Sequence, residues 1–328
     1  AELAALIGSQ TALSNRNLII NGAMRIDQRN GGSSVSTSGG GAFVPDRWGI
    51  VENSDGTGTA QQVSDSPTGF TNSFKVTTGT ADTSLAATQY MRLLHTIEGN
   101  NIAHLNWGSA NAKDVTLSFR VKSSLTGSFG ASISNSARNR SYPFTYTVNS
   151  AGTWEYKTVT IPGDTTGTWL TDNGIGMRIY FGLGYGSTYA GTAGAWAATR
   201  YESATGGVSV IGTASATWQI TGVQLEVGEQ ATPFEHRSYG DELRRCQRYA
   251  YKIGGSRNDT FGAGQGLYQD GNEFNFGPYF PPVTLRANPS LTAYGTAPGI
   301  KINGGANTGF TPTISGPFNE MQFIRLTK

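Results

Sequence analysis

The sequence has 328 residues, of which 45 are glycine and only 14% are charged, and its net charge is +2. So small a net charge argues against binding to nucleic acid, and no apolar run approaches the roughly 20 residues of a membrane-spanning helix. The single cysteine, Cys246, excludes a disulfide within the chain and a cysteine metal site. Because Gly, Ser, Thr and Asn weaken helices and suit tight turns, this composition favours short strands.

Residues 1–16 form a short arm at the start of the sequence. Ala1–Ile7 has the length for two helical turns before Gly8 ends them, and so short a helix is not stable alone. Its apolar side chains Leu3, Leu6 and Ile7 therefore need a partner. We expect this arm to attach the chain to a neighbouring protein or to other copies of itself.

Residues 17–237 are expected to form one large β domain. In Val115–Lys122 the apolar residues fall at every second position, which indicates a strand with one buried and one solvated face. The strand candidates are 18–24, 48–52, 60–63, 73–77, 86–94, 114–123, 130–134, 144–148, 155–161, 176–184 and 218–227. We expect the first and last of these to lie side by side, as they do in a jelly-roll β-sandwich.

A glycine-rich loop at about 182–207 carries exposed aromatic candidates. Tyr185, Tyr189 and Trp196 are predicted to form a platform on which a sugar ring stacks, and packing within the loop or against another chain is the alternative. Burial is expected for Trp48, Trp154, Trp169 and Trp218, because a large aromatic ring contributes most to stability when it is buried. For Trp107 the sequence favours neither burial nor exposure.

One convincing helix is predicted at 238–252. Ser238 is the expected N-cap, and Asp241 and Glu242 lie in the first turn, where acidic residues are favoured. The strand-like segments after it, interrupted by Pro281-Pro282 and Asn288-Pro289, predict a smaller β domain over 253–328.

Several segments resemble a widespread group of bacteriophage tail-fibre-like and virion structural proteins. The matching pieces are Asn17–Met24 with Gln28–Arg29, Pro45–Trp48, Gly152–Trp154, Ile161–Asp164, Gly167–Trp169, Pro282–Leu291 and, most specifically, Ile220–Arg237 running on to Tyr239–Tyr249. The resemblance implies a galactose-binding-like jelly roll similar to carbohydrate-binding modules, followed by a helix and a smaller β unit. It also implies a virion part, commonly oligomeric, and it supplies no catalytic residues; the loop at 182–207 departs from the family.

The sequence offers no recognisable catalytic or metal-binding set. Cleavage of a polysaccharide needs two carboxylates across the scissile bond, and no such pair is evident among the candidate acids Asp46, Glu52, Asp55, Glu155, Asp164, Asp172 and Glu202. The histidines His95, His104 and His236 lack metal-ligand spacing. We expect His236 to have a structural role, forming hydrogen bonds at the junction between the sandwich and the helix.

No cofactor is predicted, and no phosphate-binding loop motif occurs. The acid-rich turns 53–56 and 171–174 are where a structural calcium ion would be held, with ordinary turns as the alternative.

These features predict a non-enzymatic structural protein of a tailed phage virion, a tail fibre or other exposed appendage. Its expected partners are copies of itself, for example in a trimer, other virion proteins and host-surface polysaccharide. No signal-peptide pattern occurs in residues 1–11, so we expect folding in the host cytoplasm before assembly into the virion. A capsid-decorating or cement protein and a polysaccharide depolymerase are the alternatives.

Overall fold

The computed structural model describes residues 15–38, 40–251 and 282–286, together with the backbone of six strands between 266 and 327. Leu3, Leu6 and Ile7 lie outside the described residues. The chain divides into two compact units, Ala1–Glu242 and Leu243–Lys328, which are described separately.

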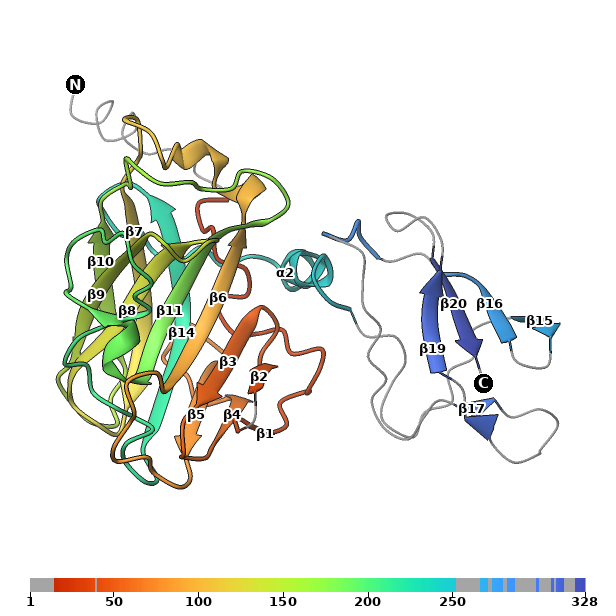
Figure 1. Cartoon of the computed structure of the whole chain (residues 1–328), viewed down its shortest axis with the longest axis horizontal. Coiled ribbons are helices and arrows are strands. Elements are labelled where there is room, and N and C mark those ends of the chain that lie inside the picture. Colours follow the sequence, from red (N-terminus) through yellow and green to blue (C-terminus); the bar gives the residue numbers. More distant parts are fainter. Residues whose placement is uncertain are drawn as a thin grey trace. The chain divides into compact units, whose positions relative to one another are not determined.

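The first unit is a sandwich of two six-stranded antiparallel sheets (Figure 1). One sheet has the strand order β1-β4-β5-β14-β7-β10, and the other has the order β2-β3-β6-β11-β8-β9. The strands are β1 Val35–Ser36, β2 Gly40–Phe43, β3 Trp48–Asn53, β4 Gly58–Val63, β5 Ser73–Thr78, β6 Tyr90–Glu98, β7 Val115–Ser123, β8 Gly127–Asn135, β9 Ser141–Val148, β10 Glu155–Ile161, β11 Ile175–Tyr185 and β14 Thr217–Val227. The predicted jelly-roll sandwich is confirmed. Within the described residues no helix has the length and apolarity to cross a bilayer.

Short elements connect these strands. They are the 3-10 turns η1 Gly99–Asn101, η2 Ala103–Leu105 and η3 Ser187–Tyr189, and the two-residue strands β12 Ala190–Gly191 and β13 Ser203–Ala204. The expected strand at 86–94 begins only at Tyr90, because Gln89 N donates to Ala86 O at 2.9 Å and closes a turn there.

Aromatic rings from both sheets fill the space between them. Phe119 of β7 lies 5.2 Å from Phe181 of β11, and Trp218 of β14 lies 5.9 Å from the same ring. Trp218 Nε1 donates to the Tyr146 hydroxyl at 3.1 Å, and burial raises the pKa of Tyr146. Each buried ring removes a large apolar area from water and stabilises the sandwich by about 2–3 kcal/mol.

Burial is as predicted for three of the four framework tryptophans. Trp48 and Trp218 are fully buried, and Trp169 is 7% exposed. The expectation is wrong for Trp154, which is half-buried, with Lys122 Nζ 5.4 Å from its ring centroid. It sits just before β10, which lies at the edge of its sheet and so has a neighbouring strand on one side only.

The opening segment at 18–24 is not a strand. Asn21 and Met24 have φ values of 59° and 56°, which break the extended conformation. The segment still lies beside β14, because Leu18 N donates to Leu225 O at 2.9 Å and Val223 N donates to Gly22 O at 3.0 Å. A Cβ on Gly22 would lie 2.1 Å from Val223 O, so this close approach requires glycine.

The helix α2, Tyr239–Gln247, is shorter than the expected 238–252. Ser238 Oγ accepts a hydrogen bond from Asp241 N at 3.2 Å, as expected of its N-cap. The second unit contains a four-stranded sheet in the order β15-β16-β20-β19 and a small β17-β18 pair. Its strands are β15 Gly266–Asp270, β16 Glu273–Tyr279, β17 Gly299–Ile300, β18 Thr308–Gly309, β19 Thr311–Ser315 and β20 Gln322–Thr327.

Candidate functional site

The loop after β11 folds back over the outer face of its own sheet. Ser132 Oγ of β8 donates to Tyr201 O at 2.9 Å, and Ser141 Oγ of β9 donates to Thr199 O at 2.6 Å. The loop crosses β8 at Gly130, where a Cβ would lie 2.2 Å from Ser203 Oγ. Glycine is therefore required at this position. The neighbours of Ser132 on β8, Ala131 and Ile133, face the core, so these contacts lie on the outer face.

A β-bulge turns Tyr185 toward this outer face. Along β11 the core side chains are Met177, Ile179, Phe181 and Leu183, so alternation alone would point Tyr185 inward. The pairing with β6 shifts between Gly182 and Gly184, after which Tyr185 lies opposite Tyr90. Gly184 has φ +147°, a conformation that favours glycine, and the bulge it allows re-aims the next side chain.

Tyrosines and arginines gather on the outer face around one buried carboxylate. We name this group the arginine–tyrosine face: Tyr90, Arg92, Arg178, Tyr180, Tyr185, Tyr189, Arg200 and Glu202. The Tyr90 ring is stacked on that of Tyr185 at 5.8 Å and meets the ring of Tyr189 edge-on at 5.7 Å. The face therefore joins two strands, β6 and β11, to the loop that follows them.

Glu202 anchors the loop to the sheet. Its side chain is fully buried and forms ion pairs with Arg92 of β6 and Arg200 of the loop, the latter at 2.8 Å. The Tyr185 hydroxyl donates to Glu202 Oε2 at 3.1 Å, and burial raises the pKa of Tyr185 well above its usual value. All three groups stabilise one carboxylate, which satisfies its charge in a buried position.

Arginine side chains also cover the rings of this face. The guanidinium carbon of Arg92 lies 4.3 Å from the Tyr90 centroid, and that of Arg200 lies 4.2 Å from the Tyr189 centroid. Both tyrosines remain half-buried rather than enclosed. The face thus offers partly exposed aromatic rings beside hydrogen-bond donors, the two kinds of group that hold a sugar ring.

Trp196 belongs to a different cluster at an end of the sandwich. Its ring lies 5.4 Å from Trp107, 5.7 Å from Trp169 and 5.3 Å from Tyr142, and its Nε1 donates to Pro162 O at 2.9 Å. We call these four rings the tryptophan cluster. No ring contact among the described residues joins it to the tyrosines of the arginine–tyrosine face. The three predicted platform residues are therefore placed in two separate groups.

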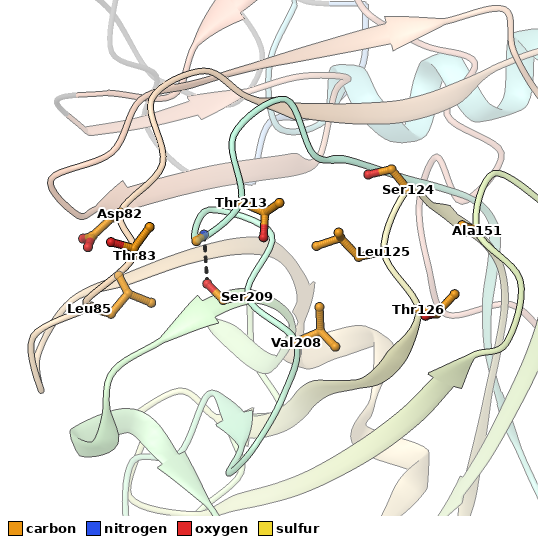
Figure 2. Close-up of a pocket in the computed structure, with 11 residues that line it drawn as sticks. Asp82, Thr83, Leu85, Ser124, Leu125, Thr126, Ala151, Val208, Ser209 and Thr213 are labelled. Carbon is orange, nitrogen blue, oxygen red and sulfur yellow. Dashed lines mark hydrogen bonds between the residues drawn. The ribbon is translucent and has the colours of Figure 1, made fainter.

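A cavity of about 600 Å³ opens among loops of the sandwich (Figure 2). It is lined by Asp82, Thr83, Leu85, Ser124, Leu125, Thr126, Ala151, Val208, Ser209, Gly212 and Thr213. The Asp82 carboxylate already accepts hydrogen bonds from Asp55 N and Ser84 N, both at 3.1 Å. With hydroxyls but no aromatic ring in its lining, the cavity lacks a surface for stacking a sugar.

The remaining candidates have structural surroundings. His236 packs against the rings of Phe70 and Phe234, at 5.3 and 4.9 Å, so ring contacts hold it at the junction, where hydrogen bonds were expected. In the turn at 171–174, Gly174 N donates to Asp172 Oδ1 at 2.8 Å, and in the turn at 53–56, Gly56 N donates to Ser54 Oγ at 3.2 Å. Among the described residues no group of three or more His, Cys, Asp or Glu is placed to hold a metal.

Sequence reasoning missed most of the arginine–tyrosine face. Tyr90 and Arg92 share one side of β6, and Arg178 and Tyr180 share one side of β11, as period-two alternation indicates. Alternation could not show that β6 and β11 are neighbours, because the paired residues Thr96 and Arg178 lie 82 positions apart in the sequence. Glu202 was recognised only as an unpaired acid.

Comparison with known proteins gives distant likenesses only. No protein-family model and no curated protein matches the sequence. The enzymatically active domain of tailspike protein 4 from bacteriophage CBA120 is 12% identical, with a TM-score of 0.34 over 65% of this chain and 21% of that one.

Two carbohydrate-binding modules match at a similar level. The family 11 module from Clostridium thermocellum, solved with a mixed-linked tetrasaccharide, is 14% identical over 60% of this chain and 95% of its own, with a TM-score of 0.29. TmCBM61, solved with β-1,4-galactotriose, is 9% identical over 65% of this chain and 100% of its own, with a TM-score of 0.28. The chain spans about a fifth of the tailspike's length, and at these TM-scores the likenesses carry no argument about function.

Proposed function

We propose that this protein is a non-enzymatic glycan-binding component of a tailed phage virion, a tail fibre or other exposed appendage. The arginine–tyrosine face binds the saccharide of the host surface. The observation that carries this proposal is the gathering of Tyr90, Tyr185 and Tyr189 with three arginines on one sheet face. Rings supply apolar area for the sugar's C–H face, and guanidinium groups donate hydrogen bonds to its oxygens.

The placement in a virion appendage rests on the sequence resemblance carried by Ile220–Arg237 and the other matching segments. In the structure, the matching blocks at the two ends of the sandwich meet. Asn17 Nδ2 donates to Val223 O at 3.1 Å, Leu225 N donates to Asn17 Oδ1 at 3.1 Å, and Asn17 N donates to Glu235 Oε2 at 3.0 Å. These blocks thus have a common structural use, since they close the sandwich.

The surroundings of the buried acids support a role without catalysis. Asp164 accepts two hydrogen bonds from Arg140, at 2.9 and 2.6 Å, and Glu202 is held by Arg92, Arg200 and Tyr185. Asp46 accepts from Gln28 Nε2 at 2.5 Å, and burial is the largest influence on its raised pKa. Carboxylates fixed by partners within the fold have little freedom to act on a glycosidic bond.

A glycan array followed by calorimetric titration tests the binding. Tyr189→Ala is expected to weaken binding about tenfold or more, because it removes a half-buried ring that Arg200 covers. The matched control is Tyr156→Ala on the opposite sheet, where Arg120 covers the ring at 5.1 Å. Binding that survives Tyr189→Ala and Tyr90→Ala would remove the arginine–tyrosine face from the proposal.

Two further measurements address the rival functions. Incubation with host polysaccharide followed by an assay for reducing ends would reveal a depolymerase. Electron microscopy of the intact particle would place the chain on the tail, as proposed, or on the head, as a cement protein requires.

A further inference from the structure

Arg178 stands out on the arginine–tyrosine face because it lacks a partner. Its side chain projects from β11 beside Thr96 of β6 and Ser134 of β8, with which it is in register. Among the residues that the structure describes, no hydrogen bond or ion pair involves the Arg178 guanidinium, and its Nε atom is buried. The side chain as a whole is half-buried, and within the described part of the chain no carboxylate pairs with its charge, so this position can accept a partner from outside the chain.

The charges around Arg178 are of its own sign. Burial lowers its pKa, and Arg138, Arg92 and Arg200 lower it further by repulsion. The one carboxylate of the face, Glu202, is already shared by Arg92 and Arg200. Glu98, farther along β6, accepts a hydrogen bond from Asn100 Nδ2 at 3.0 Å. Arg178 thus shares neither carboxylate in the described part of the chain, whereas three other arginines are close enough to lower its pKa by repulsion.

Resting on the proposed function, we infer that the glycan is an acidic saccharide and that Arg178 binds its carboxylate. A carboxylate matches the planar fork of a guanidinium and forms two parallel charge-assisted hydrogen bonds with it. It would pair with the accessible part of this half-buried guanidinium and would offset the repulsion among the four arginines. The hydroxyls of Thr96 and Ser134 flank the same position in register.

The tyrosines and Arg178 divide the recognition between them. Tyr180 is the next residue of β11 on the same side of the sheet as Arg178. It is 1% exposed, and its ring centroid lies 5.2 Å from the Arg92 guanidinium carbon. The partly exposed rings of Tyr90 and Tyr189 lie farther along the face. The rings contact the sugar body and are indifferent to its charge, whereas Arg178 discriminates an acidic from a neutral residue.

The test compares acidic polysaccharides with the same polymers after carboxyl reduction, which turns each carboxylate into an alcohol and leaves the sugar ring intact. Binding is measured on the full chain at about 0.15 M salt, where long-range attraction between exposed charges is screened. We expect at least one uronate- or sialate-bearing polymer to bind about tenfold or more tightly than its reduced form. Arg178→Gln is expected to abolish most of that preference, and Arg178→Lys, which keeps the charge but loses the fork, to retain part of it.

The matched control is Arg120→Gln, which removes an arginine that covers a tyrosine on the other sheet. It should leave the preference unchanged. Because Arg178 is a half-buried charge with no ion-pair partner in the described part of the chain, Arg178→Gln should fold and melt at least as high as the wild type, which separates lost recognition from lost structure.

The outcomes distinguish the inference from the function beneath it. If reduced polymers bind as tightly as acidic ones, or if Arg178→Gln keeps the preference, the inference fails while glycan binding stands. If sulfated polymers bind as well as carboxylated ones, the attraction is that of any polyanion and the carboxylate assignment is overturned. If neither acidic nor neutral saccharides bind, the proposed function fails as well.

Discussion

Asp164 is the best-connected carboxylate beside the tryptophan cluster, and its replacement gives a quantitative test of the fold. It is 1% exposed, and it accepts hydrogen bonds from Arg140 Nε at 2.9 Å, Arg140 Nη2 at 2.6 Å and Trp169 Nε1 at 3.1 Å. Asp164→Asn keeps the size of the side chain, but its amide group cannot accept both bonds from Arg140. The change leaves the guanidinium charge without its partner.

The expected loss follows from these contacts. Breaking a buried ion pair from one side costs about 3–5 kcal/mol. Arg140 is 17% exposed and can partly turn to water, so the lower end of that range, about 3 kcal/mol, applies. For a domain of this size each kcal/mol lowers the melting temperature by about 2–4 °C, which predicts a drop of about 6–12 °C.

The measurement is thermal unfolding of wild type and Asp164→Asn, followed by circular dichroism from pH 7 to pH 3. Burial acts to raise the pKa of Asp164, but hydrogen bonds from Arg140 and Trp169 outweigh it, and the pKa is lowered overall. A carboxyl whose pKa is lowered on folding stabilises the protein above its unfolded pKa of about 4 and loses this effect as pH falls through the folded pKa. The gap between the two proteins should therefore begin to narrow below about pH 4 and shrink further as the pH falls toward the folded pKa. A drop of less than about 2 °C at pH 7, or a gap unchanged at pH 3, would refute the reasoning.

Three other substitutions have distinct expected results. Trp196→Ala removes a ring of the tryptophan cluster and should lower the free energy of unfolding by about 2 kcal/mol in urea titrations while leaving glycan affinity unchanged; lost affinity would place Trp196 back in the site. Gly184→Ala puts a Cβ 2.5 Å from Ile211 Cγ2 at φ +147°, and we expect about 1–3 kcal/mol of destabilisation in the same assay. Burial, aided by the charge of Arg47, lowers the pKa of His95 well below its usual value, so the unfolded chain binds the proton first and stability should fall below about pH 6.5 by up to about 1.4 kcal/mol per pH unit. His95→Gln should flatten that slope in melting curves, and an equally steep slope in the variant would contradict the assignment.

The sandwich was predictable because its signal is local. In Val115–Ser123 the alternating apolar residues define a strand with one buried face, whatever the strand's neighbours are. The opening segment at 18–24 has a similar apolar character, but Asn21 and Met24 adopt left-handed conformations that depend on contacts with distant residues. The Asn21 side chain donates to Ile26 O and Asp46 O, both at 2.8 Å, and local periodicity cannot predict the second partner, 25 residues away.

The candidate site was predictable only in part, because it depends on a bulge and on a long loop. Tyr185 and Tyr189 were identified by their aromatic type within a glycine-rich loop. Tyr185 reaches the outer face only because the register shifts by one residue at Gly184. Without that shift, alternation along β11 would point Tyr185 into the core. Trp196 lies in the same loop but packs with Trp107 and Trp169, so nearness in sequence did not mean membership of one site.

The buried position of Glu202 explains why the loop and the sheet form one recognition surface. A carboxylate with no exposed area is tolerated only where charged donors surround it, and here they come from β6 through Arg92, from β11 through Tyr185 and from the loop through Arg200. Removing any one of these donors would leave a buried charge less well paired, so the loop cannot shift without a large penalty. That fixation holds Arg200 over Tyr189 and keeps both beside Tyr90. Because Arg92 and Arg200 already compensate the charge of Glu202, this carboxylate does not neutralise Arg178, and the face keeps a positive charge there.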